Sequence, residues 1–279
     1  MAQVERRMYR RRKRAARKRR LLLAAAMLCI SVGLMIWLGR SPRLKAELLQ
    51  DATPTPVTAD YDHTMETREI TLAETRWYTI QTGVFSSQEA ALEKAEAYTE
   101  RGAPGTVVQE GSKWRVFIAS YGSEEDASAV RQRLGEQQRV ETYLYCWTCP
   151  ELRLRLTGMA GQLDVVEAGF SLMLDSAVRL RDTATLLDAG QLTTAEAAAA
   201  AGDIDGQISL WMETARSRFG RQAPALVQQL QSFMEAWTPR RKELNAAAGS
   251  ATNLSAALKQ QAMGLYSDVI RFRAAVLAE

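Results

Sequence analysis

Histidine and cysteine are scarce in this chain of 279 residues, which contains one histidine, His63, and three cysteines. Zinc amidases need histidine and carboxylate ligands, and cysteine peptidases need a histidine base. His63 has no second histidine near it, and we interpret it as a solvated side chain. Both enzyme classes are therefore excluded, and no metal site and no cofactor are predicted.

Positive charge is concentrated in one short segment, although the pI of the whole chain is about 9.0. Residues 1–20 contain 11 Lys and Arg and one acid, so they carry about +10, whereas the whole chain carries +4. Everything after residue 20 is therefore mildly acidic. A nucleic-acid-binding domain needs basic patches interleaved with aromatic residues, and none is visible, so no nucleic-acid partner is expected.

A long hydrophobic run occupies residues 21–39, where 19 residues carry no charge. As a helix it would span about 28 Å, close to the roughly 30 Å hydrocarbon core of a bilayer. With the basic tail of residues 1–20 on one side and Trp37 on the other, it predicts a single-pass transmembrane helix with a cytoplasmic N-terminus. A cleaved signal peptide would have a shorter apolar region followed by a small-x-small site, whereas this run is longer and no good site follows it. We expect a cell-membrane protein whose bulk is extracytoplasmic.

Residues 40–75 show no sustained periodicity and contain the sequence Thr53-Pro54-Thr55-Pro56. This composition is typical of a flexible linker. A coil of this length typically spans about 30–35 Å, so the domain that follows would move within that distance of the membrane.

Residues 76–149 alternate between strand and helix patterns. Segments 77–85, 106–109, 113–121 and 140–145 are rich in β-branched and aromatic residues, as strands are. Helical segments begin after Ser86, which fits a capping box with Glu89, and after Ser123. The order βαββαβ predicts an α+β, ferredoxin-like domain with two helices on one sheet face and the other face open.

Alternation along the strands predicts which side chains share a face. Trp114, Val116 and Ile118 form the more apolar set of the third strand and should face the helices. Amide, guanidinium and aromatic groups on the open face suit a sugar, but the same mixture also fits a face that is merely solvated. The residues expected on the open face are Thr79, Gln81, Gly83, Lys113, Arg115, Phe117, Ala119 and Tyr121.

Two segments, WYTIQTGVFSSQEAA at 77–91 and KWRVFIASYGSEEDA at 113–127, resemble the SPOR (sporulation-related repeat) domain. The resemblance implies binding to septal peptidoglycan, with a preference for glycan strands that have lost their stem peptides, in cell division or sporulation. It also implies a glycan site on the sheet face opposite the helices, where Gln81 and Arg115 match polar positions of the family. Lys113 stands where some members have an aromatic residue. The predicted glycan-binding residues are Gln81, Arg115, Lys113, Thr79 and Phe117.

Cys146 and Cys149 form a CxxC sequence directly after the fourth predicted strand. A redox motif would open a helix, but Pro150 and another extended segment follow. A zinc site would need two more ligands, and only His63 is available outside the predicted membrane helix. A disulfide, plausible outside the cytoplasm, or a pair of free thiols remains.

Residues 150–279 are predicted to form one strand followed by an α-helical bundle. Residues 151–157 alternate strictly and would either extend the sheet or dock their leucines on the helices. Four amphipathic helices are expected from residue 161 onward, the second capped by Thr193 and the third ending at Trp237. Their apolar stripes are expected to form a core, and these helices would recruit a protein partner.

Catalysis by carboxylates alone is the one enzymatic alternative that needs no histidine. Glu167 and Asp175 lie in the first of these helices, but they match its solvated side. We therefore expect a peptidoglycan-binding protein that is not an enzyme. The alternative hypothesis is a membrane-anchored protein–protein scaffold whose ferredoxin-like domain does not bind glycan.

Overall fold

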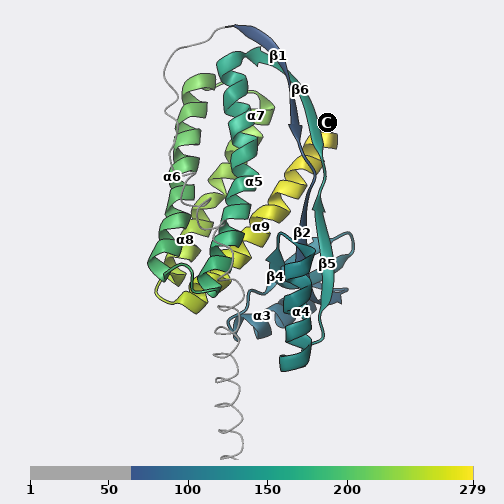
Figure 1. Cartoon of the computed structure of the whole chain (residues 1–279). Coiled ribbons are helices and arrows are strands. Elements are labelled where there is room, and N and C mark those ends of the chain that lie inside the picture. Colours follow the sequence, from purple (N-terminus) through teal and green to yellow (C-terminus); the bar gives the residue numbers. More distant parts are fainter. Residues whose placement is uncertain (1–63, 279) are drawn as a thin grey trace, which may run out of the picture.

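The computed structural model describes residues 64–278. The predicted cytoplasmic tail, the transmembrane helix, His63 and most of the predicted linker lie outside the described residues. Within residues 64–278, no helix is long and apolar enough to cross a bilayer. This part of the chain consists of a four-stranded sheet with two helices, a two-stranded ribbon and a set of longer helices (Figure 1).

The four-stranded sheet is antiparallel, with the strand order β3-β4-β2-β5. One of its faces is covered by two helices, and Val116 of β4 packs there against Ala91 and Ala95. The chain order βαββαβ confirms the predicted α+β arrangement. The elements are β2 (Thr75–Phe85), α3 (Gln88–Thr99), β3 (Thr106–Glu110), β4 (Lys113–Tyr121), α4 (Glu124–Gln138) and β5 (Tyr143–Cys149).

Serine side chains cap both helices of this unit. Ser123 caps α4, as predicted, because its Oγ accepts a hydrogen bond from the backbone N–H of Asp126 at 3.2 Å. Helix α3 is capped by Ser87 instead of Ser86, and the Ser87 Oγ accepts from Ala90 N–H at 3.3 Å. Ala91, in the first turns of α3, is fully buried against Val116 of the sheet.

Two register irregularities interrupt the pairing of β2 with β4. Gln81 pairs with Phe117, whereas the preceding residue, Ile80, pairs with Ala119, so one residue of β4 is skipped. A skipped residue reverses the face on which the following side chains lie. Ala119 therefore packs beside Ile80 on the helix-covered side. The prediction of the open face is wrong for Gly83, Ala119 and Tyr121.

A two-stranded antiparallel ribbon, β1 (Met65–Leu72) with β6 (Leu152–Met159), continues β2 and β5 beyond the sheet (Figure 1). The prediction of a linker is therefore wrong for residues 65–72. Residues 151–157 were expected either to extend the sheet or to dock their leucines on the helices. The second is observed: the leucines of β6 pack on the helices, and β6 does not join the four-stranded sheet. The sequence did not predict β1 because only two of its inward positions, Ile70 and Leu72, are apolar, so the alternation typical of a strand is weak.

The C-terminal region is helical, as predicted, with one more helix than the sequence indicated. Thr193 and Glu196 form the expected capping box. The predicted third helix is two helices, and Pro239 lies in the first turn of the second, where a missing N–H breaks no helical bond. The helices are α5 (Ala160–Asp188), α6 (Thr194–Phe219), α7 (Ala225–Glu235), α8 (Trp237–Ala247) and α9 (Ala251–Ala278).

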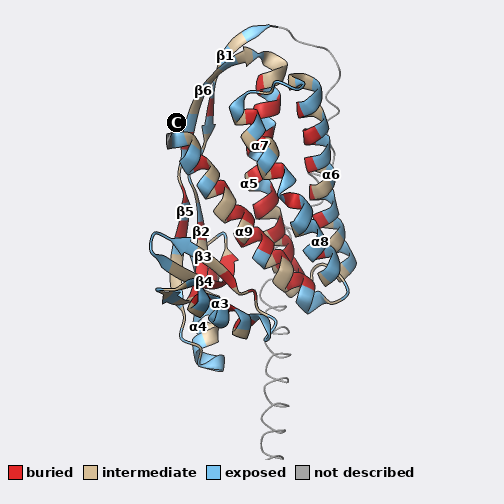
Figure 2. Cartoon of the chain, turned by 180° about the vertical axis from the view of Figure 1, so that it is seen from behind, coloured by how far each residue is buried: buried red, intermediate tan, exposed pale blue. Residues whose placement is uncertain are grey.

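Helix α9 packs on the sheet face that was expected to be open. The ring of Tyr266 stacks on Trp77 with centroids 4.1 Å apart, and Trp147 meets it edge-on at 5.3 Å. The buried Tyr266 hydroxyl donates to the carbonyl oxygens of Thr75 at 2.9 Å and Trp147 at 3.0 Å. One continuous hydrophobic core therefore runs from the sheet into the bundle (Figure 2).

The ribbon is fixed to the same helix by a buried cation. The guanidinium Nη1 of Arg273 donates to the carbonyl oxygens of Ala73 at 2.9 Å and Pro150 at 2.8 Å. Ala73 and Pro150 lie in the two short connections where the sheet passes into the ribbon. Arg273 thus ties both strands of the ribbon to α9 at the points where they leave the sheet.

We predict that the Tyr266→Ala variant loses about 3–5 kcal/mol of unfolding free energy, since a large buried ring is removed. The Tyr266→Phe variant should lose about 1–3 kcal/mol, because it removes a buried hydroxyl that donates to backbone carbonyl oxygens of the sheet. Leu210→Ala, at a half-exposed apolar site on α6, is the control and should change it by less than about 0.5 kcal/mol. Urea unfolding followed by tryptophan fluorescence measures all three. Two separate transitions, only one of them shifted by Tyr266→Ala, would contradict a shared core.

Candidate functional site

A connected polar cluster lies on the part of the sheet face beyond the aromatic contact with α9. Arg115 of β4 is its centre: Nη1 donates to Gln81 Oε1 at 2.8 Å and Nε donates to Glu110 Oε2 at 2.6 Å. The same guanidinium lies over the ring of Tyr145, 4.5 Å from its centroid. The Tyr145 hydroxyl donates to Glu110. These contacts hold the Arg115 side chain in one position.

The electrostatics of the cluster fix its protonation near neutral pH. The hydrogen bond from Tyr145 and the bond and charge of Arg115 outweigh partial burial and lower the pKa of Glu110. Burial, together with the bond to Glu110, raises the pKa of Tyr145 to about 12. Glu110 is therefore a carboxylate and Tyr145 a neutral phenol. The Arg115 guanidinium thus lies beside one fixed carboxylate.

The structure brings the predicted site residues onto one face but exposes only some of them. Arg115 retains 23% of its side-chain exposure and Lys113 is exposed, so both can reach a ligand. Gln81 is only 7% exposed and holds Arg115. Thr79 and Phe117 are fully buried, and we correct their assignment as contact residues.

The reason for that correction lies in the contacts that Thr79 and Phe117 make within the protein. Thr79 Oγ1 donates to the carbonyl oxygen of Tyr145 at 3.0 Å. The ring of Phe117 lies 5.5 Å from that of Tyr145 and 5.4 Å from that of Trp147. Phe117 thus belongs to the joint core of sheet and bundle, whereas Thr79 is bonded to the backbone of β5. No pattern within the strands reveals this packing.

Three residues of the face were missed by sequence reasoning. Glu110 pairs with Lys113, and Tyr145 and Tyr143 pair with Thr79 and Gln81. Tyr143 is an exposed aromatic side chain next to Gln81. Applying the period of two to β3 and β5, and not only to β2 and β4, would have identified all three.

A groove of about 610 Å³ separates the sheet face from α9. Arg115, Glu110 and Tyr145 line the sheet side of this groove. The opposite side is formed by α9 and by Arg240 of α8. The polar cluster therefore lies at the edge of a two-walled groove and not on an open sheet. The α8 and α9 residues that line the groove are Arg240, Gly264, Ser267, Asp268, Ile270 and Arg271.

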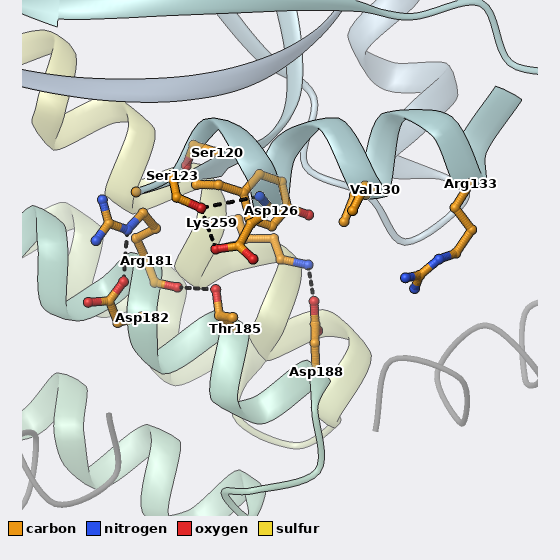
Figure 3. A pocket seen from close by; sticks show the side chains of 13 residues that line it. Ser120, Ser123, Asp126, Val130, Arg133, Arg181, Asp182, Thr185, Asp188 and Lys259 are labelled. Carbon is orange, nitrogen blue, oxygen red and sulfur yellow. Dashed lines mark hydrogen bonds and ion pairs between the residues drawn. The ribbon is translucent and has the colours of Figure 1, made fainter. Parts of the chain in front are cut away.

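A smaller cavity of about 220 Å³ lies where α4 meets the bundle (Figure 3). Ser123 at the start of α4 lines one side of it. Across it, Arg181 pairs with Asp182 at 2.8 Å and Lys259 pairs with Asp188. Because these neighbouring pairs neutralise each other, we assign the cavity to the junction of α4 with the helices and not to a ligand.

The two cysteines lie within strand β5, and of the two alternatives left open for them the pair of free thiols is the one observed. Cys146 is exposed, Cys149 is buried, and both are free thiols. Residues three apart in a strand point to opposite faces, with Cα atoms about 10 Å apart, whereas a disulfide requires less than about 7 Å. The fourth strand is longer than predicted and takes in the whole CxxC sequence. Residues 64–278 contain no group of acidic, cysteine or histidine side chains able to hold a metal ion.

We predict that iodoacetamide modifies Cys146 but not Cys149 in the native protein. Cys146 is exposed, while burial shields Cys149 and raises the pKa of its thiol. Peptide mapping by mass spectrometry reads each site separately. Denaturation without reductant should release Cys149 for modification. Protection of both thiols until a reductant is added would show a disulfide.

Comparison with known proteins identifies the sheet unit. Residues 75–144 match the family described as SPOR domain, so this segment is a SPOR domain. The chain is 28% identical over 68 residues to the endolytic peptidoglycan transglycosylase RlpA of Salmonella typhi, and equally to that of Salmonella typhimurium. The matched segment is 24% of this chain and 18% of each relative, so the chain spans less than a fifth of their length.

One solved structure is also similar to this segment. It is the solution structure of the peptidoglycan binding domain of the B. subtilis cell wall lytic enzyme CwlC. The match has 18% identity and a TM-score of 0.23, and it covers 26% of this chain and 91% of that chain.

Proposed function

We propose that this protein binds peptidoglycan through its SPOR domain, at the polar cluster centred on Arg115. The observation that carries the proposal is the fixed and partly exposed Arg115 guanidinium, set between Gln81, Glu110 and Tyr145 on the face opposite α3 and α4. The curated relatives that match this segment are peptidoglycan transglycosylases, which supports the same ligand.

The chemistry of the cluster suits a sugar strand. A guanidinium donates to hydroxyl, acetamide and carboxylate oxygens, and it is most selective when its orientation is fixed. Lys113 adds an exposed cation, and the exposed ring of Tyr143 offers a stacking surface. In this proposal Gln81 positions Arg115 instead of touching the glycan, and the role is binding and not catalysis.

The cellular setting is part of the proposal and rests on the sequence. Residues 21–39 would anchor the protein as a single-pass envelope protein, with residues 64–278 outside the cytoplasm. The ligand would be septal peptidoglycan, preferably glycan strands stripped of stem peptides, during cell division or sporulation. The outer surface of the bundle would remain available to a protein partner.

A scaffold without glycan binding is the second candidate, and one observation favours it. Thr79 and Phe117, which lie on the face that the SPOR resemblance assigns to glycan, are fully buried, and Phe117 belongs to the core shared with the bundle. If internal packing covered the whole sheet face, the domain would still have the SPOR fold but could not bind glycan there. Only the exposed cluster at Arg115 separates the two candidates.

Sedimentation of the detergent-solubilised full chain with purified sacculi tests the proposal. We predict that Arg115→Ala weakens binding at least about tenfold, since a charge-assisted hydrogen bond is lost. Gln81→Ala should weaken it less, because it only frees Arg115 to move. Sacculi treated with an amidase should bind more protein than untreated sacculi.

Arg131→Ala is the matched control, since Arg131 is an exposed arginine of the same domain on α4. It should bind like the unsubstituted chain. If the unsubstituted chain binds neither preparation, the protein is a scaffold. If it binds and Arg115→Ala binds equally well, the site lies elsewhere.

A further inference from the structure

We propose that helices α8 and α9 form a second wall of the ligand site, so that the glycan lies in the groove between the sheet and α9. This inference rests on the proposed function and deepens it, since it assigns ligand contacts to residues outside the SPOR domain. Three observations support it: the charges on that wall, a glycine that leaves room for one of the charged side chains, and buried polar atoms that have no hydrogen-bond partner.

The helical wall carries more positive than negative charge at the groove. Arg240 of α8 and Arg271 of α9 both bond to the same carboxylate, Asp268. Arg240 also donates to Gln261 Oε1 at 2.8 Å. With two guanidinium groups around one carboxylate, this wall resembles the Arg115–Glu110 pair across the groove but has one cation in excess. A ligand rich in oxygen acceptors suits both walls.

Gly264 allows Arg240 to reach the groove from α8. A Cβ atom at this position of α9 would lie 2.6 Å from Arg240 Nη1, closer than real contacts allow. The guanidinium thus lies across α9 where the helix has no side chain. A glycine in a helix interior costs stability relative to alanine, so the close approach of Arg240 accounts for its presence.

On each side of the groove, one lining residue carries a buried polar atom that has no hydrogen-bond partner. Among residues 64–278, three buried side-chain atoms have no hydrogen-bond partner: Thr106 Oγ1, Ser120 Oγ and Arg240 Nε. Thr106, which is only 8% exposed, lines the sheet wall and Arg240 lines the helical wall. Buried polar groups are normally paired. A sugar in the groove would supply an acceptor for Arg240 Nε and a hydroxyl or carbonyl oxygen for Thr106.

The substitution Thr106→Val separates a ligand contact from a structural role. Valine keeps the shape but removes a hydroxyl that has no partner within the protein, so the melting temperature should stay the same or rise. Binding of the full chain to amidase-treated sacculi should nevertheless weaken roughly three- to tenfold. Binding equal to that of the unsubstituted chain would overturn a contact at Thr106.

Arg271 tests the helical wall directly, because its side chain is 75% exposed and can be removed without a cavity. We predict that Arg271→Ala weakens sacculus binding roughly three- to tenfold, and that Arg271→Glu weakens it further. Arg241→Ala is the matched control: Arg241 lies on α8, is 53% exposed and pairs with Asp205. It does not line the groove and should bind normally.

The two sacculus preparations identify the sugar group that this wall binds. Hydrolysis of the amide that joins a stem peptide to the glycan leaves a carboxylate on the sugar and releases the peptide amine. A loss on amidase-treated sacculi alone assigns Arg271 to that carboxylate, and an equal loss on both assigns it to hydroxyl or acetamide oxygens. Unchanged binding by both Arg271 variants, while Arg115→Ala still fails, overturns the second wall and leaves the proposed function intact. Absence of binding by the unsubstituted chain overturns both.

Discussion

The packing of Tyr266 between Trp77 and Trp147 determines how the rest of this structure is arranged. A helix near the end of the chain inserts one aromatic ring into the sheet face, and its hydroxyl satisfies the carbonyl oxygens of Thr75 and Trp147. Because a buried aromatic cluster of this kind is both apolar and hydrogen-bonded, it fixes orientation as well as distance. The SPOR domain and the helices consequently share one core.

That contact also changes the character of the candidate site. A free sheet face would offer a broad surface, whereas α9 fills its aromatic half and leaves a groove beside Arg115. The ribbon β1–β6 and the buried Arg273 keep α9 in place along its C-terminal part. A glycan bound beside Arg115 would then meet protein on two sides, which favours recognition of a single strand over a flat, cross-linked sheet of wall.

Local patterns in the sequence were sufficient for the sheet unit and not for its surroundings. Strand alternation and serine caps predicted βαββαβ, and alternation also placed Gln81 and Arg115 on the same face of the sheet, but it did not reveal Glu110 and Tyr145, which bond to Arg115 or lie beside it. The register shift after Ile80 was not predictable, since a bulge changes pairing without changing composition. The burial of Phe117 was equally hidden, because its cause is a helix about 150 residues further along the chain. Periodicity predicts the end of a strand only to within a few residues. It therefore could not show that β5 continues to Cys149 and holds the two cysteines apart as free thiols.

Hydrogen–deuterium exchange of the full chain, with and without soluble glycan strands stripped of peptides, tests the groove most directly. We expect slower exchange on glycan addition in peptides from both walls, covering residues 106–117 and 143–148 of the sheet and residues 264–271 of α9. Exchange in the outer helices α6 and α7 should not change. Slower exchange confined to the ribbon β1–β6 or to α3 and α4, or no change anywhere in residues 64–278, would contradict a glycan site between the sheet and α9.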